Sequence, residues 1–122
     1  MLLLSSVAFA AWHLSAVLLP TGFNPPLAQV PVYLINATVL GAIWGMFRMI
    51  SGSVFVPSVA HGLWNGIAYV FFGFGAMRGA LGIEETAIYG PEAGLLGLAA
   101  NLLFAIVLWF RTVKPSTYPG TA

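Results

Sequence analysis

The stretch VPVYLINATVLGAIWGMFRMI, residues 30–50, decides the fold class, because its only charged residue is Arg48, close to its end. A helix needs about 20 apolar residues to cross the roughly 30 Å hydrocarbon core of a bilayer. This stretch has that length. It is also too continuous for a strand of a membrane barrel, which alternates apolar and polar residues over about 10 positions. The stretch therefore predicts a transmembrane helix.

Three further apolar segments accompany it, at about residues 1–20, 54–77 and 93–113. The segments are separated by TGFNPP at 21–26, SGS at 51–53 and a longer polar stretch over 78–92. Clusters of Gly, Pro, Asn and Ser of this kind are typical of turns. We expect an all-α, polytopic transmembrane helical bundle of about four spans, with residues 1–122 forming a single transmembrane domain.

The composition of the whole chain points the same way. Of its 122 residues, 60% are hydrophobic and 6% are charged, and the mean hydropathy is +0.96. Soluble domains carry about 25% charged residues. The low charge argues against a soluble enzyme, a nucleic-acid binder and a disordered tail. The chain has no Cys, which excludes a disulfide framework and a thiol nucleophile. We expect the lipid bilayer as a partner, and no nucleic acid.

The few basic residues predict the orientation. With four spans, both termini and the 51–53 turn share one side, which holds Arg48, Arg111 and Lys114, whereas the other side holds Arg78. Cytoplasmic loops carry an excess of Lys and Arg, so we expect an integral plasma-membrane protein with cytoplasmic N- and C-termini. Pro115 closes the fourth segment.

The first segment has a second interpretation, as a signal peptide. Ala8-Phe9-Ala10 resembles a cleavage site, but no Lys or Arg precedes it, which disfavours cleavage. The acidic residues Glu84, Glu85 and Glu92 are expected to form a solvated loop outside the membrane.

Small residues recur at a spacing of four, which lets helix backbones approach closely. The pairs are Gly41 with Gly45, Gly62 with Gly66, and Ala93 with Gly97. We interpret all three as helix-packing faces. Single amides inside a membrane commonly form hydrogen bonds between helices, and we expect this role for Asn36 and Asn101.

Three other polar residues inside the segments are candidates for function, because ionisable groups in a membrane are costly and usually face the bundle interior. They are His13, His61 and Asn65. His61 and Asn65 are four residues apart and so project from one helix face, as do Phe9 and His13. If the first helix starts at Ser5, His13 lies about 12 Å along it, and His61 lies about 10 Å along the third helix. The two helices run in the same direction, so we expect the imidazoles to meet in one polar site.

The residues alone describe half of a hydrolytic site. A zinc site needs at least three protein ligands, and two histidines are too few. Hydrolysis without a metal needs a base to activate water and donors for the oxyanion, and no carboxylate lies inside a segment. The serines near His13 form only a weak Ser–His signal without a third group. A His-lined substrate or ion pathway stays open as the alternative.

The pattern Phe9-x-x-x-His13 followed by His61-x-x-x-Asn65 resembles the second and third motifs of the CPBP family (CAAX protease and bacteriocin-processing), also called the Abi family and related to type II CAAX prenyl endopeptidases. The resemblance covers about residues 5–75. The family's first motif, Glu-Glu-x-x-x-Arg, has no counterpart before Phe9. The pair Glu84-Glu85 comes after the third motif, and Tyr89 stands at the Arg position.

The resemblance implies an intramembrane endopeptidase that hydrolyses peptide bonds near the membrane, with His13, His61 and Asn65 as catalytic residues. They would hold the water and the oxyanion, while the base, a glutamate of the first motif, would be absent. We therefore expect the C-terminal part of a longer protease with little activity alone, or else a non-catalytic scaffold or immunity-type paralogue. The implied partner is a peptide or membrane-protein substrate, prenylated or not. No cofactor is certain, and a divalent metal held by His13 and His61 stays open.

Overall fold

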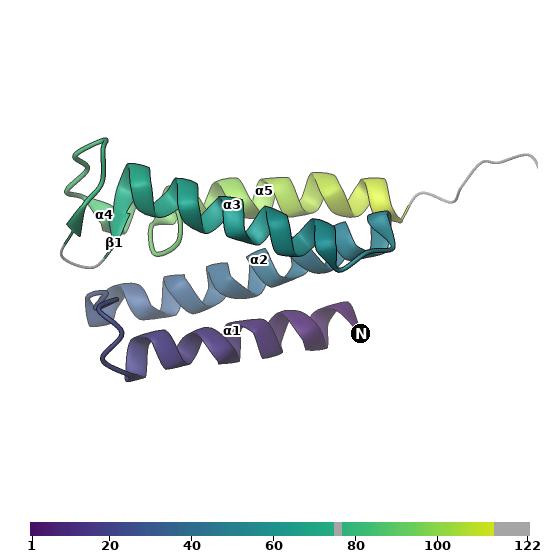
Figure 1. Ribbon diagram of the computed structural model, residues 1–122, viewed down its shortest axis with the longest axis horizontal. Helices are drawn as coiled ribbons and strands as arrows, with labels where there is room; N and C mark the ends of the chain where they lie inside the picture. Colours follow the sequence, from purple (N-terminus) through teal and green to yellow (C-terminus); the bar gives the residue numbers. More distant parts are fainter. Residues whose placement is uncertain (75–76, 114–122) are drawn as a thin grey trace, which may run out of the picture.

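Each of the four predicted segments contains one long helix in the computed structural model, which describes residues 1–74 and 77–113 (Figure 1). The long helices are α1 (Leu2–Leu18), α2 (Val30–Ser51), α3 (Phe55–Phe72) and α5 (Leu95–Thr112). The described part of the chain is thus mainly helical, and the predicted all-α class is confirmed. Lys114 and Pro115, on which the predicted end of the fourth segment and part of the orientation depend, lie outside the described residues.

Short elements connect the long helices at one end of the bundle. They are the 3-10 helix η1 (Leu27–Gln29), the single turn α4 (Thr86–Tyr89) and two short antiparallel strands, β1 (Gly73–Phe74) and β2 (Met77–Arg78). In the strand pair, Gly73 lies opposite Arg78. Figure 1 shows these connections at the end of the bundle opposite to the N-terminus.

Two predicted helix ends are wrong, for local reasons. Helix α1 begins at Leu2 and not at Ser5, whose hydroxyl donates to the Leu2 carbonyl inside the helix at 2.8 Å. Helix α3 does not continue to Met77, because Gly73 takes a φ of +93° and turns the chain into β1. A side chain would be strained at this φ, so glycine is the residue that permits the turn.

Helix α2 is the centre of the bundle, and the other three long helices pack against it. Consecutive long helices run in opposite directions, so α1 and α3 run in the same direction, as predicted (Figure 1). Leu40, Ile43 and Met46 of α2 form the buried apolar core. Side chains from all three neighbouring helices cover them, among them Leu2, Phe9, Trp64, Ala105 and Leu108.

Of the three predicted small-residue faces, one packs two helices together. A Cβ atom at Gly41 would lie 3.0 Å from the Cα of Ser6, and one at Gly45 would overlap Leu2, so α1 approaches α2 at these glycines. The prediction for Gly62 and Gly66 is wrong, because a Cβ atom at either would meet no atom of the described chain within 4 Å.

The third predicted face packs on its own connection. Gly97 touches the main chain of the turn that precedes α5, at the carbonyls of Gly90 and Pro91, rather than a second helix. The expected packing of Ala93 and Gly97 between helices is therefore wrong. The small size of Gly97 instead lets the turn fold tightly against the first turn of α5.

The predicted role of the two asparagines is confirmed. The Asn101 amide of α5 donates to Oδ1 of Asn36 in α2 at 3.0 Å. Both side chains are buried, with exposed fractions of 7% and 0%. This hydrogen bond joins α2 and α5 inside the apolar interior, where an unpaired amide would be costly.

Within the described residues, two helical stretches are long and apolar enough to cross a membrane, Leu27–Ser51 and Leu95–Thr112. Helix α1 is apolar but shorter, and α3 carries His61 and Asn65 in its middle. Large apolar side chains point outward along α3 and α5, including Leu63, Ile67, Leu103 and Phe110. Such continuous exposed apolar surface is rare on soluble monomers.

Candidate active site

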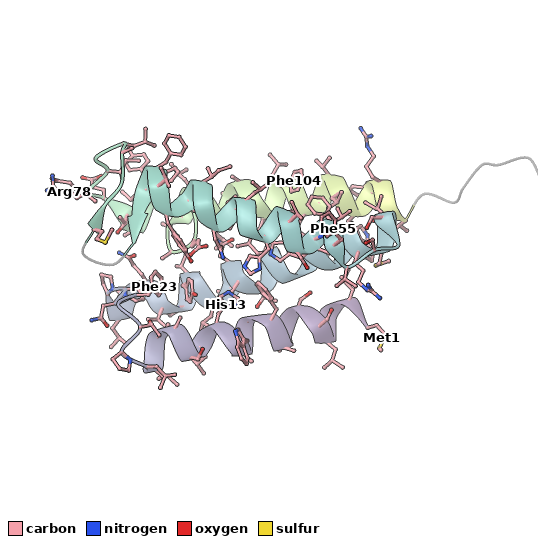
Figure 2. The ribbon with its side chains drawn as sticks, in the orientation of Figure 1. Met1, His13, Phe23, Phe55, Arg78 and Phe104 are labelled. Carbon is pink, nitrogen blue, oxygen red and sulfur yellow. The ribbon has the colours of Figure 1, made fainter. Side chains whose placement is uncertain are left out.

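The two motif helices bring their polar residues together in the interior of the bundle. The ring centroids of His13 in α1 and His61 in α3 are 6.2 Å apart. The Phe9 ring lies 4.3 Å from the His13 ring and 5.3 Å from the His61 ring, so it packs against both imidazoles. Figure 2 shows His13 on the side of α1 that faces the other helices. The predicted meeting of the two histidines is what the structure shows.

Hydrogen bonds fix the tautomers of both rings. Nδ1–H of His13 donates to the Phe9 carbonyl at 2.8 Å, because a carbonyl can only accept. The Nε2 atom of His13 is then the acceptor. The Asn65 amide donates to Nε2 of His61 at 3.3 Å, which leaves the proton of that ring on Nδ1. Each motif therefore orients its own histidine through a residue four positions away.

A small cavity lies between these side chains, with a volume of about 10 Å³. This is close to the smallest volume that admits one water molecule, roughly 10–15 Å³. Aromatic and aliphatic side chains form part of its wall, and polar groups from three helices and one turn form the rest. The lining residues are Phe9, His13, Tyr33, Ala37, Leu40, His61, Trp64, Asn65 and Glu92.

The residues do not fit a metal site. Within residues 1–74 and 77–113, no three side chains of His, Cys, Asp or Glu come close enough together to share an ion. A catalytic zinc ion takes three protein ligands and a water. His13 and His61 supply two donors, and none of the steps proposed below uses a metal.

Glu92 was expected in a solvated loop, and that expectation is wrong. The residue is half-buried and lines the small cavity beside the two histidines. Its Oε1 atom accepts a hydrogen bond from Nε1 of Trp64 at 3.2 Å. Burial raises the pKa of Glu92 above its usual value, although the Trp64 hydrogen bond and the nearby His13 oppose the rise. Glu84 and Glu85 are exposed, as expected, and Glu84 pairs with Arg78.

Asn36 holds the turn that carries Glu92. Its amide nitrogen donates to the main-chain carbonyls of Pro91 at 2.8 Å and of Glu92 at 2.9 Å. Asn101 supports Asn36 from the other side and also reaches the Pro91 carbonyl at 3.4 Å. A sequence signal for this arrangement exists in retrospect. Glu92 directly precedes the apolar segment, whereas Glu84 and Glu85 lie in the middle of the polar stretch.

A much larger open cavity, of about 540 Å³, adjoins the site at the end of the bundle with the short connections. It lies among the 23–29 segment, the end of α3, β2, α4 and the turn before α5. Glu92 lines both this cavity and the small one. The side chain therefore stands between a space large enough for a peptide segment and the pocket that holds the histidines.

Comparison with known proteins places these motifs in a family. The family model described as type II CAAX prenyl endopeptidase Rce1-like matches residues 1–67, which is more than half of the chain and includes both histidines and Asn65. No curated protein and no solved structure matches the chain. The chain belongs to the membrane-embedded type II CAAX prenyl endopeptidase Rce1-like family of CAAX proteases.

Proposed function

We propose that this chain carries the hydrolytic site of a CAAX-type intramembrane endopeptidase, with His13, His61 and Asn65 as its catalytic residues. One observation carries the proposal: the two family motifs meet around a cavity of about 10 Å³, with the imidazole rings 6.2 Å apart. A water molecule in this cavity would donate to Nε2 of His13, its remaining acceptor. The amide of Asn65 and the Nδ1–H of His61 are donors for the oxyanion that forms at the substrate carbonyl.

The substrate is a peptide or membrane-protein segment that ends in a CAAX-like sequence, prenylated or not. The open cavity of about 540 Å³ is the space in which it would lie, with the scissile bond directed toward the histidines. A prenyl chain could extend along the outward-facing apolar side chains of α3 into the bilayer. Peptide-bond hydrolysis at this depth needs a route for water, which the open end of the bundle provides.

We propose that all four long helices cross the plasma membrane. Helix α3 spans it despite His61 and Asn65, because these side chains point into the bundle and contact other groups of the site. Arg48 and Arg111 lie at the same end of the bundle, and Arg78 lies at the other (Figures 1 and 2). This distribution supports cytoplasmic termini by the excess of basic residues on that side.

We further propose that residues 1–122 form the C-terminal part of a larger CPBP domain. The 122 residues contain no Glu-Glu-x-x-x-Arg sequence, so we expect this chain alone to be a weak enzyme. A natural form of the protein that carried the motif upstream would hydrolyse the same peptides faster. The sequence that precedes Met1 in the gene is the direct check on this proposal.

The test of the function is cleavage of a fluorogenic, prenylated CAAX-type peptide by the protein in liposomes. The changes His13→Ala and His61→Ala should each lower kcat by roughly 10²–10⁴-fold, the usual contribution of a positioned acid, base or donor. The matched control is Trp12→Ala, because Trp12 is adjacent in sequence but 77% exposed, and it should cleave like the wild type.

Full activity in either histidine variant would refute the assignment of the site. An inactive wild type, in the 122-residue chain and in every longer natural form, would instead favour a non-catalytic scaffold. In that case the polar pocket would exist without chemistry.

A further inference from the structure

We infer that Glu92 supplies the carboxylate base of this site, and that the activity of the 122-residue chain depends on it. The inference rests on the proposed function and goes beyond it, because neither family motif includes this residue. The family match ends at residue 67, so Glu92 lies outside the matched region. Its place beside the histidines is visible only in the folded chain.

The position of the carboxylate is the first argument. Glu92 lines the cavity that His13, His61 and Asn65 also line, and it lines the wide open cavity as well. A base must reach the water on one side and the arriving peptide on the other. Among the three acidic residues of the chain, Glu84 and Glu85 are exposed and do not line the histidine cavity, so Glu92 is the one that meets this condition.

The second argument is how firmly the residue is held. A solvated loop needs no buried partners, yet the main chain at Pro91 and Glu92 accepts two hydrogen bonds from the fully buried Asn36. The side chain accepts a third from Trp64, which is on α3 one turn after His61. Pre-organised groups of this kind are a feature of catalytic sites, because a base held in place needs no reorganisation during the reaction.

The chemistry of the step balances without a cofactor. The oxygen of the water attacks the carbonyl carbon of the scissile bond while one water proton moves to the Glu92 carboxylate. The tetrahedral oxyanion is stabilised by the donors of Asn65 and His61. The carbon–nitrogen bond then breaks, and the proton on Glu92 passes to the leaving nitrogen, which departs as an amine. The products are a carboxylic acid and an amine, and Glu92 returns to its ionised form.

The partial burial of Glu92 suits this role. Because burial raises the pKa of its carboxyl, the carboxylate is a stronger base than an exposed glutamate. Bases whose pKa lies nearer to the working pH transfer protons more effectively.

The test is Glu92→Gln in liposomes, with the same fluorogenic peptide. Gln keeps the shape and can still accept from Trp64, and the hydrogen bonds from Asn36 reach only the main chain, so the fold should persist. We expect kcat to fall by roughly 10²–10⁴-fold with KM little changed, since basicity and not binding is removed. The control Glu85→Gln removes an exposed acid of the same connection and should behave like the wild type.

A labelling experiment provides a readout that needs no variant. A hydrophobic carbodiimide reacts with protonated carboxyls in apolar surroundings, so it should modify Glu92 in the wild-type protein in preference to Glu85. A peptide with an N-methylated, uncleavable scissile amide should protect Glu92 from the reagent, because the bound peptide covers the carboxylate. The same peptide should leave the slow labelling of Glu85 unchanged.

The outcomes separate this inference from the proposed function. If His13→Ala abolishes cleavage while Glu92→Gln retains wild-type kcat, the site is hydrolytic and Glu92 is not its base. Failure of the uncleavable peptide to protect Glu92 would overturn the inference even if Glu92→Gln did not fold. If the wild-type protein cleaves nothing, the proposed function fails and this inference fails with it.

Discussion

Replacement of Asn36 by Leu should destabilise the bundle far more than an ordinary substitution in a membrane helix. The Asn36 side chain is 0% exposed and takes part in three hydrogen bonds, two to the carbonyls of Pro91 and Glu92 and one from Asn101. Leu is similar in size, so the volume of the site is nearly conserved and the loss is mainly polar. The three hydrogen bonds lose their partner at once.

The expected cost follows from these three contacts. Interhelical hydrogen bonds in membrane proteins contribute about 0.6 kcal/mol each on average and up to about 1.7 kcal/mol. A buried polar group left without a partner costs roughly 1–3 kcal/mol. The Asn101 amide keeps its longer contact with the Pro91 carbonyl, at 3.4 Å, which limits the loss. We therefore expect Asn36→Leu to lower the free energy of unfolding by about 2–4 kcal/mol.

The assay is unfolding in mixed micelles by increasing SDS mole fraction, followed by far-ultraviolet circular dichroism. The matched control is Thr38→Val on the same helix. The Thr38 hydroxyl donates only to the Leu34 carbonyl of its own helix, at 3.0 Å, so no tertiary hydrogen bond is lost and the change should stay within about 0.5 kcal/mol. Equal unfolding free energies for the two variants would refute the view that Asn36 anchors the turn before α5.

The other predictions concern helix packing and pH. Gly41→Ala should cost about 1–3 kcal/mol, since its Cβ would lie 3.0 Å from the Cα of Ser6, whereas Gly62→Ala should be neutral or up to about 1 kcal/mol stabilising, because it meets open space. The same SDS titration measures both, and a larger loss at Gly62 would contradict the packing described for α1 and α2. The pKa of Glu92 is raised in the folded chain, so the folded chain holds this proton more tightly than the unfolded chain does. Its contribution to stability is therefore complete below the unfolded pKa and is lost as the pH rises through the folded pKa. Unfolding free energies of the wild type and Glu92→Gln, compared from mildly acidic to neutral pH, should show a relative loss in the wild type, and a relative gain would be the opposite of this expectation.

Much of the site could be predicted from the sequence, because the relevant patterns are local. A spacing of four places Phe9 with His13, and His61 with Asn65, on single helix faces, whatever the rest of the chain does. Antiparallel succession of four apolar segments then makes the first and third helices run in the same direction. These two facts were enough to predict that His13 and His61 meet. The buried amides were predictable for a similar reason, since Asn36 and Asn101 interrupt otherwise apolar helices.

The tertiary structure alone decided where the carboxylate lies and which small residues pack. The hydrogen bond between Asn36 and the carbonyl of Glu92 joins residues 56 positions apart, and no periodicity in the sequence specifies such a contact. The same holds for Gly41 and Gly62. Both have the spacing of a packing face, but α1 covers one and no part of the described chain covers the other. The sequence by itself determined the helices and the faces of the two histidine motifs, since these depend on neighbours one turn away. Only folding determined that Glu92 completes the cavity between them, because that depends on a turn drawn inward by amides from two other helices.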